Sequence, residues 1–201
     1  MKPQTVPLRP VVFLDRDGTV IEDADYLDGE NPAGVRVLPG VPGALRRLRA
    51  AGRELVVISN QSGVARGLFT ELDARRVNAE VDARLRAEGV DVLDWLYCPH
   101  LDDPAATVEA YRTACACRKP RPGMMEEAAR RHGLDLAGCV VVGDKTIDVL
   151  AAKAVGGRGV LVLTGKGRDI VAKGRPPEAA AVVEGLKEAA DWILSSPPTS
   201  P

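Results

Sequence analysis

Short aliphatic runs alternate with longer amphipathic segments along most of this chain. The runs lie at residues 11–14, 55–58, 92–97, 139–142 and 160–163. They are rich in Val, Leu and Ile and mostly lack polar alternation, which is typical of parallel strands covered by helices on both faces. The pattern therefore predicts an α/β fold with a doubly wound, Rossmann-like parallel sheet.

The segments between these runs predict the crossover helices. Helical spacing and capping signals place helices at residues 42–51, 70–88, 124–132, 146–155 and about 177–194. Residues 99–118 have neither helical nor strand periodicity, and a loop of that length is usually functional or disordered. We expect a single domain over residues 1–201, with a core of about 11–165 and a C-terminal helix at about 177–194.

Composition limits the classes of partner. The 201 residues contain 27 Lys and Arg against 28 Asp and Glu, so no net field attracts nucleic acid or an anionic membrane. The longest apolar runs are far shorter than the roughly 20 residues of a membrane helix. The first ten residues lack the apolar stretch of a signal peptide. We expect a cytoplasmic protein that acts on a small molecule and is able to act as a monomer.

Polar residues follow three of the expected strands. The first strand ends in Asp15-Arg16-Asp17-Gly18-Thr19, the second in Ser59-Asn60-Gln61, and the fourth in Gly143-Asp144. The carboxyl ends of such strands form the ligand crevice of a doubly wound sheet. Three acids at one edge would repel each other without a cation, and oxygen ligands suit Mg²⁺. Taken alone, however, an Asp-x-Asp-Gly sequence is most often only a turn.

These segments together resemble the four motifs of the haloacid dehalogenase superfamily. The resemblance rests on residues 13–19, 58–61 and 142–145, with Lys119 and Asp148. Cys98-Pro99-His100 and Cys115-Ala116-Cys117-Arg118-Lys119-Pro120 are similar to the branch of heptose-bisphosphate and histidinol-phosphate phosphatases. The match runs from about residue 11 to 165.

The resemblance implies a phosphomonoester hydrolase that works through an aspartyl-phosphate. Asp15 would be the nucleophile, and Asp17 would act as general acid and then as general base. A catalytic Mg²⁺ would be held by Asp15, by the main-chain carbonyl of Asp17 and by Asp144. Ser59 and Lys119 would complete the catalytic set by donating to the phosphoryl oxygens.

Two features separate hydrolysis from related chemistries of the superfamily. Dehalogenation needs no acid two residues after the nucleophile, so Asp17 favours phosphate transfer. The superfamily's mutases carry a large cap that excludes water, whereas only about 24 residues, 18–41, follow the first strand here. We therefore expect a minimal cap and hydrolysis. Asp148 is expected to orient Lys119 or the metal shell.

The cysteines predict a second metal. Cys98, His100, Cys115 and Cys117 bracket the aperiodic loop, and three thiolates with one imidazole suit tetrahedral Zn²⁺. A disulfide is disfavoured in a cytosolic setting. With four protein donors the zinc would be structural, closing a zinc-binding loop at residues 98–117. The fourth cysteine, Cys139, begins a predicted strand and is expected to be part of the core.

The substrate is the least determined feature. The expected substrate-binding residues are Asp23, Tyr26, Asn60, Gln61, Arg66, Arg118 and Lys145. The two arginines suit a second anionic group, as in a sugar bisphosphate, although Arg66 is nearly as well explained as a solvated side chain. The resemblance implies removal of the 7-phosphate of D-glycero-D-manno-heptose 1,7-bisphosphate. Histidinol-phosphate hydrolysis and a non-catalytic binding module on the same fold remain alternatives.

Overall fold

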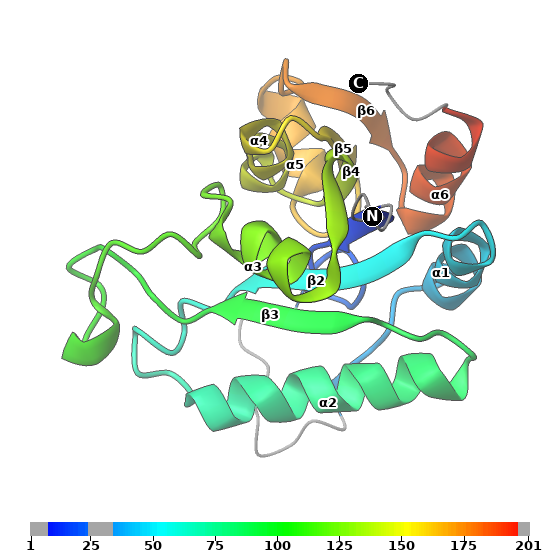
Figure 1. The fold of residues 1–201 in the computed structure, drawn as a ribbon. Helices are drawn as coiled ribbons and strands as arrows, with labels where there is room; N and C mark the ends of the chain where they lie inside the picture. The colour runs from blue at the N-terminus through cyan, green and yellow to red at the C-terminus, as the bar shows by residue number, and fades with distance from the viewer. Residues whose placement is uncertain (1–7, 24–33, 197–201) are drawn as a thin grey trace, which may run out of the picture.

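A six-stranded parallel sheet forms the centre of the protein (Figure 1). The structure is a computed structural model that describes residues 8–23 and 34–196. The strands are β1 (Arg9–Leu14), β2 (Glu54–Asn60), β3 (Asp94–Cys98), β4 (Leu134–Gly143), β5 (Arg158–Val162) and β6 (Ala179–Val183). Their order in the sheet is β3-β2-β1-β4-β5-β6, with parallel neighbours throughout. This confirms the predicted doubly wound, Rossmann-like sheet.

Helices connect the strands and cover both faces of the sheet. They are α1 (Val41–Ala50), α2 (Glu71–Ala87), α3 (Gly123–His132), α4 (Thr146–Ala154), α5 (Gly167–Lys173) and α6 (Leu186–Ser195), with a short 3₁₀ helix η2 (Glu109–Tyr111). The predicted capping box at Thr70 is present, because its side chain and that of Asp73 each accept from the other's backbone N–H. Among the described residues, no helix is both long and apolar enough to span a membrane.

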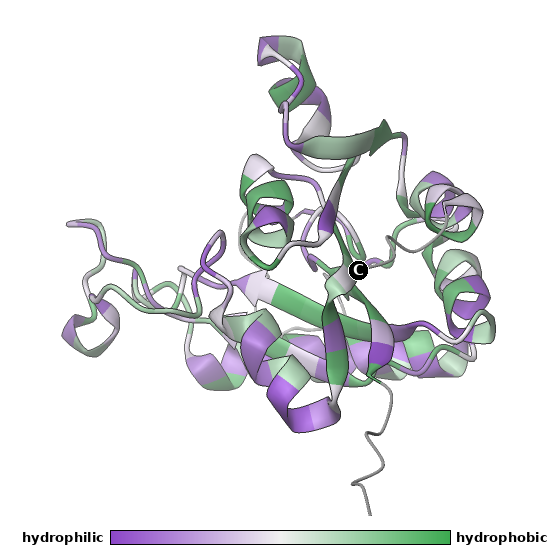
Figure 2. Ribbon diagram, turned by 45° about the horizontal axis from the view of Figure 1, so that its top comes forward, coloured by the Kyte–Doolittle hydropathy of each residue, from purple (hydrophilic) through white to green (hydrophobic). Residues whose placement is uncertain are grey.

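Alternation within β1 divides the core into two layers. Val12 and Leu14 face a layer formed with α1, α2 and α6, whereas Val11 and Phe13 face a layer formed with α3 and α4. Figure 2 shows the hydrophobic colour concentrated in the central strands and mixed colours on the helices. Burial on both faces explains why these strands read as continuous apolar runs in the sequence.

The C-terminal region corrects one prediction. A helix expected at about 177–194 is wrong over its first half, because Ala179–Val183 forms β6 and the helix α6 begins only at Leu186. The alanines favour a helix by propensity, but pairing with β5 and burial of Ala179 and Ala181 decide the outcome. Helix α5 is absent from the expected elements, because its seven residues carry too little apolar periodicity to be recognised.

The chain order reverses between β1 and β4, and this position defines the crevice of the sheet. From β1 the chain builds outward to β2 and β3, and it then returns to add β4, β5 and β6 on the other side. The carboxyl ends of β1 and β4 are therefore adjacent, which is where ligands bind in such sheets. Figure 1 shows the segment between β3 and α3 extending past the carboxyl ends of β2 and β3.

Candidate active site

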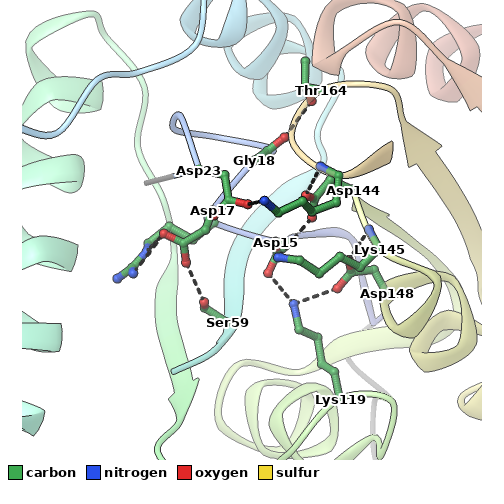
Figure 3. A network of polar contacts seen from close by, with 12 residues as sticks. Asp15, Asp17, Gly18, Asp23, Ser59, Lys119, Asp144, Lys145, Asp148 and Thr164 are labelled. Atoms are coloured by element: carbon green, nitrogen blue, oxygen red, sulfur yellow. Dashed lines mark hydrogen bonds and ion pairs between the residues drawn. The ribbon is translucent and has the colours of Figure 1, made fainter. Parts of the chain in front are cut away.

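Three segments of the chain bring four charged side chains together at the carboxyl edge of the sheet (Figure 3). Asp15 follows β1 and Asp144 follows β4, while Asp148 lies in the first turn of α4. Lys119 comes from the loop before α3. All four residues are buried. Charged groups are almost never this buried unless they are paired, so their contacts define what the site can do.

Lys119 is the central cation of the cluster. Its Nζ lies 2.5 Å from Asp15 Oδ1 and 2.7 Å from Asp148 Oδ1, and it donates to the carbonyl of Ile58 at 2.8 Å. These partners use the three protons of an ammonium group. Burial alone would lower the pKa of Lys119, but Asp148 and Asp15 raise it above its ordinary value, so the side chain is charged.

The main chain of Lys119 is fixed by Asn60 at the end of β2. The side-chain amide of Asn60 donates to the Lys119 carbonyl and accepts from the Lys119 N–H, both at 3.0 Å. Asn60 is therefore placed to orient the lysine. These two bonds use one N–H and one lone pair of the amide, which leaves one donor and one acceptor position for a substrate.

Two carboxylate oxygens of the cluster have neither a hydrogen bond nor the close ion pair with Lys119 that Asp148 Oδ1 makes. Oxygens of Asp15, Asp144 and Asp148 all lie within 4.8 Å of one another. Asp148 is engaged by Lys119 and by the backbone N–H of Lys145 at 3.0 Å. Asp15 Oδ2 and Asp144 Oδ1 are buried without a hydrogen bond, and Asp144 Oδ1 has only the Lys145 ammonium at 3.5 Å. Unpaired buried carboxylate oxygens are costly. Oxygen donors in this arrangement fit a hard divalent cation such as Mg²⁺.

Burial dominates the ionisation of these acids. It raises the pKa of Asp15 to about 7, although Lys119 acts in the opposite direction. Burial likewise raises the pKa of Asp144 above its ordinary range, against the lowering effect of Lys145. A cation between the two carboxylates would favour their ionised forms.

The loop after β5 fixes Asp144, although its sequence carries no recognisable motif. The backbone N–H of Lys166 donates to Asp144 Oδ2 at 2.8 Å, and the Thr164 hydroxyl donates to the Gly18 carbonyl at 2.6 Å. Gly18 and Gly165 both have positive φ, and a Cβ at either position would overlap Asp144 Oδ2. Glycine is therefore required where these two loops close on the carboxylate.

Asp17 is held by a different set of donors. Arg16 Nη2 lies 3.1 Å from Asp17 Oδ1, while Gln61 Nε2 and Ser59 Oγ donate to Oδ2 at 2.8 and 3.3 Å. Burial acts to raise the pKa of Asp17, but Arg16 and Gln61 lower it below its ordinary value. The carboxylate is therefore ionised in this state. Gln61, expected to bind substrate, instead donates to both Asp17 and Ser59.

Two further expected substrate contacts lie at the rim of the cluster. Lys145 Nζ is 3.5 Å from Asp144 Oδ1, and Asp23 Oδ2 is 3.6 Å from Lys166 Nζ. Although burial lowers the pKa of Lys145, Asp15 and Asp144 raise it overall. The predicted contact of Tyr26 lies outside the described residues.

The two arginines expected to bind a second anionic group lie on the connecting loops. Arg118 Nη1 donates to the carbonyl of His100 at 3.1 Å, which ties it to the predicted zinc loop. The main-chain carbonyl of Arg66 accepts from Thr107 at 2.9 Å, so the Arg66 loop supports the same segment. Both arginines are half-buried.

The four predicted zinc ligands form one cluster. Cys98 Sγ lies 3.5 Å from Cys115 Sγ, and Cys117 Sγ lies 3.4 Å from both Cys115 Sγ and His100 Nδ1. Tetrahedral Zn–S and Zn–N bonds imply donor separations of roughly 3.5–3.8 Å. All four cysteines are free of disulfides, and burial raises the pKa of the remaining Cys139 thiol to about 12. The donor set and its spacing fit a structural zinc.

Known proteins match both the sequence and the fold. A HAD-hydrolase-like family model matches residues 116–189. A D-glycero-beta-D-manno-heptose-1,7-bisphosphate 7-phosphatase of Salmonella typhi is 40% identical over 188 residues, which are 93% of this chain and 90% of that protein. One of the same name from Rhodopseudomonas palustris is 43% identical over 152 residues, covering 76% and 82%.

Solved structures of heptose bisphosphate phosphatases also match the fold of this chain. The D,D-heptose 1,7-bisphosphate phosphatase of B. bronchiseptica, complexed with magnesium and phosphate, superposes with a TM-score of 0.79 at 38% identity. The match covers 92% of this chain and 98% of that one. The enzyme of the same name from Burkholderia thailandensis gives a TM-score of 0.68 at 31% identity, covering 94% and 100%.

Proposed function

The chain belongs to the haloacid dehalogenase-like phosphatases, in the family of the heptose-1,7-bisphosphate 7-phosphatases, and on this basis we propose that it hydrolyses a sugar phosphomonoester through an aspartyl-phosphate on Asp15. One observation carries the proposal. Asp15 is buried, with Oδ1 held by Lys119 and Oδ2 unpartnered beside the other carboxylates of the cluster. A carboxylate has two oxygens, so Asp15 is able to bind a metal through one and attack phosphorus with the other, and the Lys119 ammonium beside it favours the ionised, nucleophilic form.

Asp15, the Asp17 carbonyl and Asp144 would hold Mg²⁺, consistent with the buried oxygens of the two carboxylates that make no hydrogen bond. When bound, the ion offsets the repulsion between a carboxylate nucleophile and a phosphate dianion, and it stabilises charge in the transition state. The main-chain N–H of Lys166 keeps Asp144 turned so that Oδ1 faces the cluster.

Ser59 and Lys119 would bind the oxygens of the transferring phosphoryl group. The Lys119 ammonium is charged and lies beside the nucleophile, and the Ser59 hydroxyl comes from the neighbouring strand end. Such prepositioned donors stabilise developing charge without reorganisation. Asp148 would orient Lys119 through its 2.7 Å ion pair rather than react itself.

Asp17 would supply the proton for the leaving oxygen and later remove one from the attacking water. Its ionised state here suits the base half of the cycle, and the acid half requires that it take up a proton when substrate enters. The second half-reaction breaks the acyl-phosphate bond of Asp15 by attack of water on phosphorus. It releases inorganic phosphate and restores the carboxylate.

The favoured substrate is a heptose 1,7-bisphosphate cleaved at the 7-phosphate, because the relatives that match nearly the whole chain carry that activity in their names. Arg118, Arg66 and Lys145 supply the positive charge that a second phosphate needs, and Asp23 and Tyr26 would contact the sugar. The four-donor zinc site would fix the loop that leads to Arg118 and Lys119. The free thiols suit a reducing, cytoplasmic setting.

A phosphate-release panel tests the proposal. Purified protein with Mg²⁺ is given both anomers of heptose 1,7-bisphosphate and histidinol phosphate, and kcat/KM is compared, with ³¹P NMR identifying the phosphate removed. The expected result is loss of the 7-phosphate at the highest kcat/KM. A preference for histidinol phosphate would assign the chain to that activity instead. No release from any of the three would favour the binding module.

A further inference from the structure

Arg16 is a buried cation that the proposed mechanism does not use. It lies between the two catalytic aspartates in sequence, and only 2% of its surface is exposed. An arginine is almost never this buried unless its guanidinium is paired, because removing the charge from water is costly. Its partners therefore indicate what it does.

One end of the guanidinium is anchored on α2. Arg16 Nη1 donates to Asn78 Oδ1 at 2.6 Å, a buried contact between residues that are 62 positions apart. Asn78 is flanked by the core residues Val77 and Val81, so its amide is held by the packing of the helix. The anchor is thus a buried side chain on a helix outside the active-site loops.

The other end of the guanidinium holds Asp17. Arg16 Nε and Nη2 donate to Asp17 Oδ1 at 3.2 and 3.1 Å. The second carboxylate oxygen receives Gln61 Nε2 at 2.8 Å and Ser59 Oγ at 3.3 Å. Both oxygens of Asp17 are therefore constrained, and Figure 3 shows its side chain directed toward Ser59 while Asp15 faces Lys119.

We propose that Arg16, anchored by Asn78, is a positioning residue that sets the placement of the Asp17 carboxylate for proton transfer to the leaving oxygen. The inference rests on the proposed function and extends it to two residues without an assigned role. A planar guanidinium can bridge two partners at fixed angles, which a lysine ammonium cannot do equally well. Without the bridge, Asp17 keeps its chemistry and its Oδ2 contacts but loses the donors that fix Oδ1.

This role predicts a dependence on the leaving group. A sugar alkoxide must be protonated as it departs, whereas the p-nitrophenolate ion leaves without a proton. Misplacing a general acid therefore slows an alkyl phosphate and spares an activated aryl phosphate. A purely structural role for Arg16 would slow both substrates equally, because it would reduce the amount or the shape of the whole site.

The experiment compares kcat/KM for heptose 1,7-bisphosphate and for p-nitrophenyl phosphate in Arg16→Met, Arg16→Lys and Asn78→Leu. Arg9→Met is the matched control, because Arg9 lies at the opposite end of the strand that precedes Arg16 and pairs with Glu54. The ratio of the two constants does not depend on the folded fraction. Partial unfolding of a variant therefore leaves the comparison valid.

Arg16→Met is expected to lower kcat/KM for the sugar substrate roughly 10²-fold, within the range of general-acid catalysis, while most of the aryl rate remains. Arg16→Lys and Asn78→Leu should lie between wild type and Arg16→Met, and Arg9→Met should leave the ratio unchanged. In an Asp17→Asn background, Arg16→Met should add no further loss on the sugar substrate.

Equal losses on the two substrates, or a full additional loss in the Asp17→Asn background, would overturn the positioning role. Those outcomes leave the proposed function intact, since wild-type turnover of the sugar substrate is measured in the same series. If the wild type fails on the sugar substrate, the proposed function fails and not merely the role of Arg16.

Discussion

Replacing Lys119 by methionine removes the only described cation that contacts both Asp15 and Asp148. Its ammonium and the two carboxylates are at least 95% buried, with ion-pair distances of 2.5 and 2.7 Å. Truncating one partner of a buried ion pair costs about 3–5 kcal/mol, because the remaining charge is left uncompensated. In a protein of this size that loss corresponds to a fall in Tm of about 6–20 °C.

The assay is denaturant unfolding in magnesium-free buffer, with Lys153→Met as the matched control. Lys153 is 68% exposed and lies 3.8 Å from Glu178, so its loss should cost at most about 1 kcal/mol. Added Mg²⁺ should narrow the gap between Lys119→Met and wild type, because it neutralises the carboxylates that the lysine leaves behind. Equal stability of the two methionine variants without Mg²⁺ would refute the reasoning.

Three further predictions concern the metals and the pH dependence. Gly165→Ala should raise the Mg²⁺ concentration needed for half-maximal activity, because its Cβ would displace Asp144, the proposed metal ligand. Gly156→Ala, also at a positive φ but with open space around it, should not. Metal analysis should find about one zinc per chain in wild type and in Cys139→Ala but none in Cys117→Ser, and retention of zinc by Cys117→Ser would contradict the assigned ligand set. Burial raises the pKa of Asp15 to about 7 in the folded, magnesium-free protein from roughly 4 in an unfolded chain. A raised pKa means that the folded protein binds the Asp15 proton more tightly than the unfolded chain does. The stability that this proton contributes is fully present below about pH 4 and is lost as the pH rises through about 7. In magnesium-free unfolding experiments, the stability of Asp15→Asn relative to wild type should therefore increase from pH 4 to pH 7. If the unfolding free energies of the two proteins change in parallel over this range, the pKa of Asp15 is not raised.

The sheet and most of the charged cluster could be predicted from the sequence, because both follow from local signals. Aliphatic runs mark the strands, and each run ends in the polar residues that the parallel topology then gathers at one edge. The clustering of the four proposed zinc ligands is predictable for a similar reason. They form two closely spaced pairs at the ends of one aperiodic loop, and closing that loop brings the pairs together.

The parts that could not be predicted depend on contacts between distant segments. Nothing local marks Asn78 as the partner of Arg16, because it is one polar residue on an amphipathic helix until α2 packs against the sheet. The loop at Gly165 carries no recognisable motif, and its role emerges only when β5 lies beside β4. The alanines of β6 favour a helix, and only pairing with β5 overrides that propensity.

In the proposed mechanism the phosphoryl group passes through the Asp15 carboxylate. Rapid acid quench during turnover of heptose 1,7-bisphosphate, followed by peptide mass analysis, tests it directly. The expected result is one added phosphoryl group on the peptide that contains Asp15, and neither adduct nor turnover in Asp15→Asn. Turnover by Asp15→Asn, or a phosphoryl group on another residue of the wild type, would contradict the account.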